Sequence, residues 1–174
     1  MSDEDSWCDC GFGDHSVTTE LIGERVVAGV RDVITLIGTA TGQLATTQPS
    51  PDRWSALEYA AHVRDVLLTI RDRLVIGLVE DQPGFKPMYR DHRVHLGLYH
   101  ADTVENVVPE LLASSTMFQR LFTAIDPALH DRIVLFGFPS PEPRSLLWMG
   151  RQAVHEIEHH LEDIRENFRL LSAR

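Results

Sequence analysis

Apolar residues recur every three to four positions along four stretches of the chain, which is the spacing of one face of an α-helix. The first stretch spans residues 17–46, the second begins at Asp52 or Ser55 and ends near residue 80, the third spans residues 102–125, and the fourth spans residues 143–171. In the first stretch the recurring apolar residues are Leu21, Val26, Val30, Val33, Ile34 and Ile37. The pattern predicts four long amphipathic helices.

Two segments between these stretches lack the helical rhythm. Residues 83–101 are rich in proline and glycine and carry His92, His95 and His100. We expect a long loop there, and a loop of this length usually serves a function such as covering a site. Residues 132–143 are first apolar and then rich in proline, and we expect an extended segment or part of a hairpin.

Together these elements predict an all-α protein, a four-helix bundle with a long crossover loop between its second and third helices. The length of 174 residues is that of one domain. We place this domain at residues 17–174 and treat residues 1–16 as an amino-terminal, cysteine-containing tail.

Charge and composition exclude several classes of partner. The chain has 16 Lys and Arg against 26 Asp and Glu, a net charge of −10, which disfavours binding to nucleic acid or to anionic membranes. No apolar run reaches the ~18 residues of a membrane span, and the first residues lack the basic and apolar regions of a secretory signal. Two cysteines are too few for a disulfide framework. We therefore expect a cytoplasmic protein that binds neither nucleic acid nor membranes.

The candidate chemistry is densest in the fourth stretch, in the sequence VHEIEHHLEDIREN. Two pairs there have the i, i+4 spacing that puts side chains on one helical face: His155/His159 and Glu156/His160. Relative to Ile157 at the centre of the apolar face, His160 lies about 60° away and Glu156 about 100°, whereas His155 and His159 lie about 160° away. The helical wheel thus predicts that Glu156 and His160 point into the bundle and that the other pair faces water.

A carboxylate and an imidazole on a buried face are costly unless they are paired or bind a metal. Glu156 and His160 could therefore be metal ligands, or they could hydrogen-bond across the bundle, or Glu156 could reach solvent. In the second stretch, His62 lies on a polar stripe with Glu58 and Asp65. By itself this stripe is equally consistent with a solvent-facing surface.

Two segments of the chain resemble the DinB-like superfamily: WSALEYAAHVRDV, from Trp54 to Val66, and HEIEHHLEDI, from His155 to Ile164. This superfamily includes the mycothiol-dependent maleylpyruvate isomerases and the bacillithiol and mycothiol S-transferases. The resemblance implies an up-down-down-up bundle that holds one divalent metal. One ligand comes from the second helix, and two ligands four residues apart come from the fourth.

Carried across residue by residue, the resemblance implies His62, Glu156 and His160 as the metal ligands. It makes Asp65 and Asp163 candidates for orienting the imidazoles from outside the ligand set. Three nitrogen and oxygen ligands with open positions suit Zn²⁺, which we expect, with Fe²⁺, Mn²⁺ or Ni²⁺ as alternatives.

Many relatives have histidine where this chain has Glu156, so the pair His155/His159 stays open as a second choice of ligands. Glu58, on the same stripe as His62, could also orient an imidazole, but we expect it to be a surface carboxylate.

The resemblance implies an enzyme that activates a low-molecular-weight thiol, such as mycothiol, for attack on an electrophile. We therefore expect a metal-dependent thiol S-transferase or thiol-assisted isomerase, with a small-molecule thiol and an electrophile as its partners, assembled as a homodimer. The alternative is a non-catalytic metal-binding stress protein or a dimeric interaction module. Hydrolysis by metal-activated water ranks below both. A ligand-sized cavity beside the metal would favour an enzyme, whereas a fourth protein ligand would favour the non-catalytic alternative.

The amino-terminal tail carries two cysteines, in the sequence CDCGFG that begins at Cys8, with His15 nearby. This looks like half of a zinc knuckle, but a single residue between the cysteines is unusual and no second cysteine pair completes a four-ligand site. We expect a flexible tail, or one tucked against a groove, with a redox or separate metal-binding role as the lesser alternative. Replacing Cys8 and Cys10 with serine should then leave the bundle metal unaffected.

Overall fold

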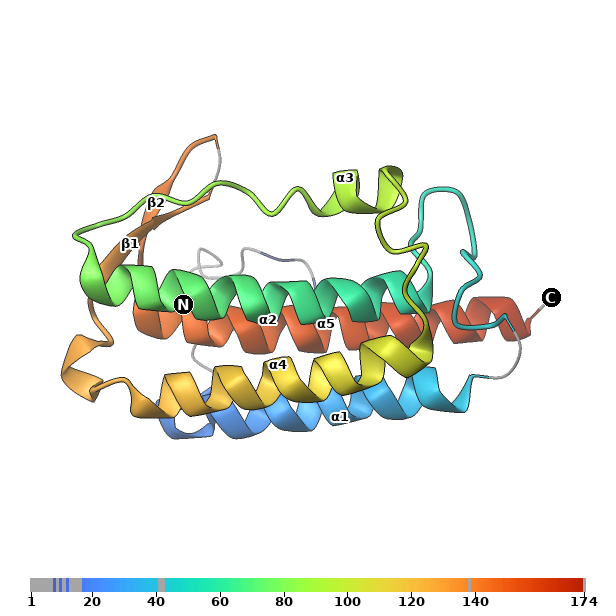
Figure 1. Ribbon diagram of the computed structural model, residues 1–174, viewed down its shortest axis with the longest axis horizontal. Helices are drawn as coiled ribbons and strands as arrows, with labels where there is room; N and C mark the ends of the chain where they lie inside the picture. The colour runs from blue at the N-terminus through green and yellow to red at the C-terminus, as the bar shows by residue number, and fades with distance from the viewer. Residues whose placement is uncertain are drawn as a thin grey trace.

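Four long helices dominate the structure. The computed structural model describes residues 8, 10, 12, 17–40, 43–137 and 139–173 of the chain. Figure 1 shows that the first and last of the long helices run in one direction and the two middle ones in the opposite direction, which is the predicted up-down-down-up topology. The predicted four-helix bundle is thus confirmed. The four helices are α1 (Ile22–Thr39), α2 (Ala56–Val79), α4 (Val104–Ala124) and α5 (Leu146–Ser172).

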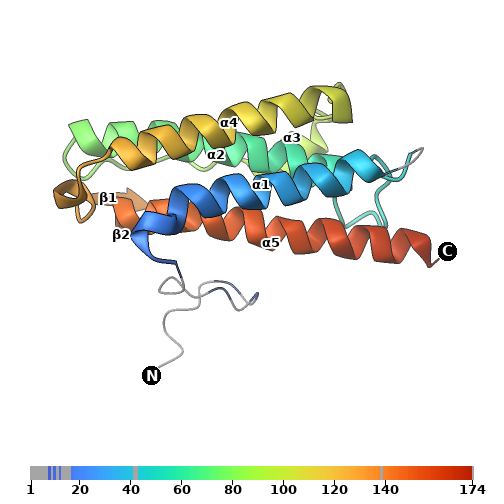
Figure 2. The same ribbon diagram turned by 90° about the horizontal axis from the view of Figure 1, so that it is seen from below.

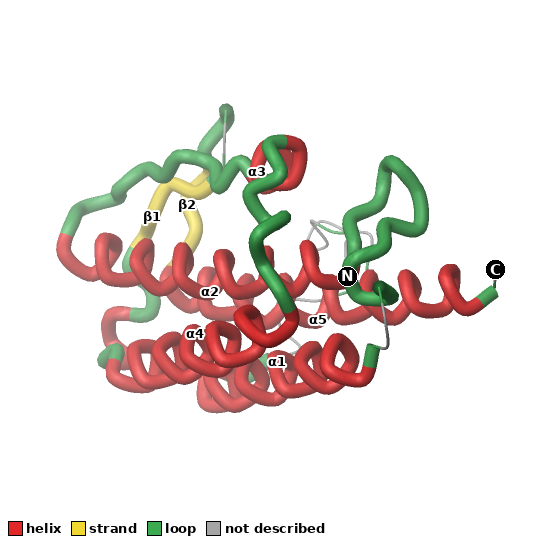
Figure 3. The backbone as a smooth tube through the Cα atoms, turned by 45° about the vertical axis from the view of Figure 1, so that its right-hand side comes forward, coloured by secondary structure: helices red, strands yellow, loops and turns green. Residues whose placement is uncertain are grey.

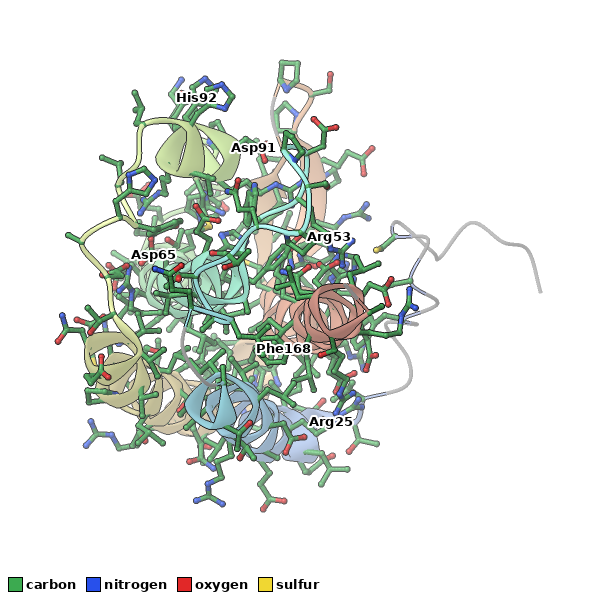
Figure 4. All side chains as sticks on the ribbon, turned by 90° about the vertical axis from the view of Figure 1, so that its right-hand side faces the viewer. Arg25, Arg53, Asp65, Asp91, His92 and Phe168 are labelled. Carbon is green, nitrogen blue, oxygen red and sulfur yellow. The ribbon has the colours of Figure 1, made fainter. Side chains whose placement is uncertain are left out.

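Each long helix packs against two neighbours. Helices α1 and α2 both contact α4 and α5, and they lie at opposite corners of the bundle with few contacts between them. Figure 2 shows α1 between α4 and α5, and the end-on view of Figure 4 shows the four helices around a common core. This arrangement makes α2 and α5 direct neighbours, so side chains of the two predicted metal-bearing helices can meet.

The apolar stripe predicted for the first helix faces the centre of the bundle, where Val26, Val30 and Val33 are fully buried. Gly150 of α5 leaves space for the Phe122 ring of α4, because a Cβ atom at this position would lie only 2.3 Å from Cε2 of Phe122. The Phe122 ring can fill this part of the core only because residue 150 has no side chain.

The start of α2 is fixed by a capping box between Ser55 and Glu58. The Ser55 hydroxyl accepts a hydrogen bond from the Glu58 amide at 3.2 Å, and the Glu58 carboxylate accepts one from the Ser55 amide at 2.7 Å. Of the two predicted caps, Asp52 and Ser55, the structure uses the second. Glu58 is 7% exposed, so the expectation of a surface carboxylate is wrong: its carboxylate is needed at the helix end.

The crossover between α2 and α4 covers one side of the bundle. It contains a short helix, α3 (Arg90–His95), and is anchored through Asp65 of α2, which accepts hydrogen bonds from Nη1 of Arg93 at 2.5 Å and from the Tyr99 hydroxyl at 3.0 Å. Figure 1 shows this segment running back along the bundle to the start of α4. The long loop predicted from the sequence thus covers the bundle and contains one short helix.

A small antiparallel hairpin, β1 (Ile133–Phe136) and β2 (Glu142–Ser145), lies between α4 and α5 in the chain. Figure 3 shows it rising on the same side of the bundle as the crossover. The two meet where the Leu135 amide donates to the Pro83 carbonyl at 2.9 Å. Because β2 occupies residues 142–145, the last helix begins at Leu146, three residues later than predicted.

Two 3₁₀ turns, η3 (Thr19–Leu21) and η4 (Pro127–Leu129), complete the elements. Helix α1 is shorter than the predicted stretch 17–46, because Ala40 adopts an extended backbone and ends it. In the described part of the chain, no helix combines the length and the apolar character that crossing a membrane requires.

Candidate metal centre

The facing sides of α2 and α5 bring three metal-ligating side chains together. His62, Glu156 and His160 each offer a donor atom, and these atoms lie within 4.8 Å of one another. Nε2 of His62 is 3.6 Å from Oε2 of Glu156, and Nε2 of His160 is 3.5 Å from the same oxygen. The structure therefore brings together the three residues that the sequence proposed, and we call them the inner cluster.

Both α5 members of the inner cluster are held in place by further side chains. Gln152, one turn earlier on α5, donates to Oε1 of Glu156 at 2.7 Å, which leaves Oε2 facing the imidazoles. Nδ1 of His160 is hydrogen-bonded to Oδ2 of Asp163 at 3.0 Å. Arg53 donates to Oδ1 of Asp163 at 3.1 Å, so this carboxylate is itself oriented. Asp163 thus lies where a residue that positions His160 must lie.

The donor atoms of the inner cluster fit a divalent metal. Nε2 of His62 and Nε2 of His160 are buried and have no hydrogen-bond partner among the described residues. An ionised Asp163 can only accept, so in neutral His160 the proton is on Nδ1 and the Nε2 lone pair points at a carboxylate oxygen. Such a contact is repulsive without a cation between the atoms.

The distances agree with this interpretation. Nitrogen and oxygen ligands of a tetrahedral Zn²⁺ lie about 3.3 Å apart, and the two measured nitrogen–oxygen separations are 3.5 and 3.6 Å. Both separations are too long for ordinary hydrogen bonds, which end near 3.2 Å for N–H donors.

Burial and neighbouring charges set the protonation states of the inner cluster so that it attracts positive charge. Burial lowers the pKa of His62, which keeps this imidazole in the neutral form that binds metals. Burial also opposes a charge on His160, but its contacts with Asp163 and Glu156 outweigh burial and raise its pKa. Burial alone would raise the pKa of Glu156, yet the two imidazoles hold it well below its ordinary value. Glu156 is therefore an anion that attracts a proton to His160 or a metal to the cluster.

Two aromatic rings pack against the imidazoles. The Trp54 ring centroid is 5.3 Å from that of His62, and the Tyr59 ring is stacked on His160 at 5.2 Å. Burial raises the pKa of Tyr59, so its hydroxyl stays protonated. These rings keep water from the imidazoles, which strengthens electrostatic interactions within the cluster.

A cavity of about 530 Å³ opens beside His62 and Glu156. Its volume lies in the range of small-molecule sites. The crossover and the hairpin form walls opposite α2 and α5, in the region where Figure 3 shows both rising above the bundle. The lining combines apolar residues with three cations, and the main members are Val66, Ile70, Arg73, Phe85, Lys86, Met88, Arg90 and Phe136.

Arg73 ties the walls of this cavity together. Its guanidinium lies over the Phe85 ring at 5.2 Å and over the Phe136 ring at 5.4 Å, and it donates to the Lys86 carbonyl. Burial lowers the pKa of Arg73, but guanidinium groups remain charged in proteins. One α2 side chain thus holds both the crossover and the hairpin and adds a positive charge to the cavity.

The family model of the DinB superfamily matches residues 27–164, which is most of the chain. The chain belongs to the DinB superfamily. The chain is similar in fold to YfiT from Bacillus subtilis, described as a probable metal-dependent hydrolase with an unusual four-helix bundle topology. That match has a TM-score of 0.80 at 14% identity and covers 97% of this chain and 94% of YfiT.

A conserved protein from Enterococcus faecalis is also similar, with a TM-score of 0.65 at 15% identity over 90% of this chain and 98% of that one. A comparison with curated proteins gives no match.

Within this DinB fold, Asp65 does not orient an imidazole, in contrast to our expectation. Its oxygens accept hydrogen bonds from Arg64, Arg93 and Tyr99, and neither ring nitrogen of His62 has a hydrogen-bond partner among the described residues. The spacing of three residues places Asp65 near His62, but three donors from elsewhere draw its carboxylate away. Asp65 instead fastens the crossover to α2.

Of the three histidines in the crossover, only His92 borders the cavity. His95 and His100 are exposed and do not line it. Figure 4 shows His92 on α3, above the end of the bundle. The expectation that this histidine-rich segment covers the site is therefore correct for the backbone and for His92 only.

The outward pair on α5 differs most from its prediction. His155 is only 3% exposed, although the helical wheel places it on the water side. Cys8 lies beside His159 and Cys10 beside His155, and the four residues form a second group of possible metal ligands. Burial lowers the pKa of His155 to about 4, so its imidazole is neutral. The predicted tail of residues 1–16 is described only at three positions, and His15 lies outside the described residues.

Sequence reasoning missed several residues that shape the centre. The i, i+4 spacing of Gln152 and Glu156 was a usable signal, since such pairs face each other on a helix. No comparable signal marks Arg53, Tyr59 or Arg73, because their partners lie on other elements.

Proposed function

We propose that this protein is a metal-dependent enzyme in which His62, Glu156 and His160 hold one divalent ion, Zn²⁺ in the first instance. Its reaction transfers a low-molecular-weight thiol to an anionic electrophile, or uses the thiol to isomerise one. The observation that carries the proposal is the convergence of two buried, unpartnered imidazole nitrogens on one oxygen of Glu156, beside a cavity.

The cavity favours an enzyme over a non-catalytic metal protein. The inner cluster has three members among the described residues, and catalytic zinc sites have three protein ligands and an open position. The cavity reaches His62 and Glu156, so a substrate in it lies against the ligands themselves. A purely structural ion would have a closed ligand set instead.

The acid–base inventory of the cavity favours a thiol over water as the nucleophile. A bound divalent ion supplies Lewis acidity, which lowers the pKa of a thiol or a water molecule at the open position. The pKa of a free thiol is about 8.5, so a small decrease is enough to form a thiolate at neutral pH, whereas the pKa of free water is far higher. Apart from Glu156, the only carboxylate among the described lining residues is Asp91, whose side chain is 76% exposed and paired with Arg90. The other candidate base, His92, is exposed. The described lining therefore holds no buried general base for water besides the proposed ligands.

The charges of the lining point to an anionic electrophile. Arg73, Lys86 and Arg90 border the cavity of a chain whose net charge is −10. Three cations thus gather around one cavity although the protein as a whole is strongly negative. Guanidinium groups bind carboxylates and phosphates with paired hydrogen bonds, and the apolar rings of the lining suit the remainder of the substrate.

Hydrolysis is the second candidate, supported by the similarity in fold to YfiT, which is described as a probable metal-dependent hydrolase. The two reactions differ in one requirement. A thiol transferase consumes thiol and electrophile together, whereas a hydrolase turns over esters or amides with no thiol present.

The test uses the full chain, purified without a tag and reconstituted with Zn²⁺. Thiol consumption is measured with mycothiol and simple thiols, each paired with a carboxylate-bearing electrophile and with its neutral amide. We expect metal-dependent consumption that prefers the anionic electrophile. In Arg90→Ala, the KM for the anionic electrophile should rise about tenfold and the KM for the amide should stay unchanged, since one charge-assisted contact is lost. His95→Ala, an exposed change outside the cavity, is the matched control.

Two results contradict the proposal. Turnover of esters or amides without thiol would identify a hydrolase. One tightly bound ion with no turnover of any of these substrates would support the non-catalytic alternative.

A further inference from the structure

The second cluster on α5 has no role in the proposed reaction. Sγ of Cys8 is 3.5 Å from Nδ1 of His159, and Sγ of Cys10 is 3.2 Å from Nε2 of His155. All four donor atoms lie within 4.8 Å of one another. The two thiols thus lie close to the two imidazoles, although every cysteine is at least 145 positions from either histidine in the chain. We call these four residues the outer cluster.

The donor set of the outer cluster matches zinc in type and in geometry. Two sulfur and two imidazole ligands in a tetrahedron are a common structural zinc site. With metal–ligand distances of about 2.3 Å for sulfur and 2.0–2.1 Å for nitrogen, adjacent sulfur and nitrogen atoms lie about 3.6 Å apart. The measured separations of 3.2 and 3.5 Å need only a small adjustment. Hydrogen bonds between each thiol and its imidazole would not require the two pairs to converge.

The surroundings of the cluster support a site that joins the amino-terminal segment to α5. The Phe12 ring packs on His155 with their centroids 5.0 Å apart, and His155 is almost fully buried. The two thiols are not joined in a disulfide. Terminal segments are usually poorly ordered unless something ties them down, and a four-ligand zinc site does so.

The inner and outer clusters share no ligand. Asp163 lies between them, with Oδ2 3.0 Å from Nδ1 of His160 and 3.5 Å from Nε2 of His159. These three residues are a further possible ligand group, but they offer no thiol, and Arg53 already occupies Oδ1 of Asp163. The carboxylate therefore supports one imidazole of each cluster from outside.

We propose that Cys8, Cys10, His155 and His159 bind a second divalent ion, Zn²⁺, in a closed structural site. Binding releases the two thiol protons to solvent, because thiolates are the ligands. The ion fastens the amino-terminal segment to the outer face of α5. With four protein ligands it has no open position and takes no part in the reaction.

The first test counts metal in the full chain, purified without a tag and dialysed against buffer containing a weak chelator. We expect about two zinc ions per wild-type chain, one for each complete ligand set. Cys8→Ser/Cys10→Ser should retain one ion, and His62→Ala/His160→Ala should retain the other. His95→Ala is the matched control and should retain both. Circular dichroism checks that each variant is helical.

The second test identifies the ligands by replacing zinc with Co²⁺. Thiolate ligands give cobalt an intense near-ultraviolet charge-transfer band, and tetrahedral cobalt absorbs strongly in the visible. We expect the charge-transfer band in the wild type and in His62→Ala/His160→Ala, and we expect its loss in Cys8→Ser/Cys10→Ser.

The outcomes separate this proposal from the proposed function. A wild type with one ion that survives Cys8→Ser/Cys10→Ser, or a cobalt protein without a thiolate band, would overturn the outer site and leave the inner one standing. A wild type with one ion that disappears in the cysteine variant would support the outer site while the inner site fails.

Discussion

Helix α5 carries two clusters of metal-ligating side chains that differ in how they are completed. The inner cluster combines Glu156 and His160 with His62 of the neighbouring helix and opens onto a cavity. The outer cluster combines the residues one position earlier, His155 and His159, with two cysteines from the start of the chain. The first offers three possible ligands beside space for a substrate, and the second offers four. If both proposals hold, one histidine-rich part of a helix serves reactivity on one side and structure on the other, depending on what covers each side.

The largest expected effect is on the rate of thiol consumption, when one ligand of the inner cluster alone is removed. In His62→Ala we expect the rate of thiol consumption to fall more than about 100-fold, because removing a ligand exceeds the 10–100-fold effects of residues outside the ligand set. In Cys8→Ser/Cys10→Ser the rate should stay within about threefold of wild type, since a structural ion does not touch the substrate. Equal losses of rate in both variants would show that the two clusters act as one site.

A smaller effect is expected from Asp163→Asn, which changes the residue between the clusters. We expect the affinity of the inner cluster for Zn²⁺ to fall about 10–100-fold, because an amide orients and polarises His160 less well than a carboxylate. Competition with a chromophoric chelator measures this affinity. Glu162→Gln, at the exposed neighbouring position, is the control and should have no effect. Unchanged Zn²⁺ affinity in Asp163→Asn would show that this aspartate does not support metal binding by the inner cluster.

A pH titration sharpens the comparison further, because only one inner ligand gains a proton near neutral pH. The pKa of His160 is raised above 6.5 by its carboxylate neighbours, whereas the pKa values of His62 and Glu156 are lowered. As the pH falls through the raised pKa, a proton competes with the metal, and inner-site affinity should drop about tenfold per unit. The loss should begin above pH 6.5. The measurement uses Cys8→Ser/Cys10→Ser, in which only the inner site remains. An affinity that stays constant from pH 8 to 6 would contradict the assignment of His160.

The smallest effect concerns Glu158, which lies between the two outer histidines in sequence and pairs with Arg25 of α1. Both side chains are about one-third exposed, and such pairs contribute less than about 1 kcal/mol. Glu158→Gln should therefore shift the urea midpoint only slightly and leave both ions bound. Loss of an ion in this variant would mean that the outer ligand set is wrong.

The fold and the inner cluster could be predicted from the sequence because their signals are local. Apolar spacing gave the helices, and the wheel separated Glu156 and His160 from the other pair, since the apolar face of a helix reports which way the core lies. The partner His62 came from the resemblance to a family, because its own polar stripe did not distinguish core from surface.

The outer cluster could not be predicted, because its completion is not local. A helical wheel assumes that the side opposite the core is exposed to water. No pattern in the sequence around His155 indicates that Cys10 and Phe12 contact it. The cavity could not be predicted for the same reason. Its Arg73 contacts Phe85 of the crossover and Phe136 of the hairpin, two segments that lie apart from Arg73 in the sequence.

The helix directions have a consequence for how this protein can diverge. Because α2 and α4 point the same way (Figure 1), the chain must travel back along a helix of 24 residues before it can begin the next one, a distance of about 36 Å. Connectivity alone thus obliges a long span to cross the bundle, and the cavity lies beneath it. The helices that carry the candidate ligands can stay constant while this span varies, so new substrate preferences can arise from changes in a connection that contributes none of these ligands.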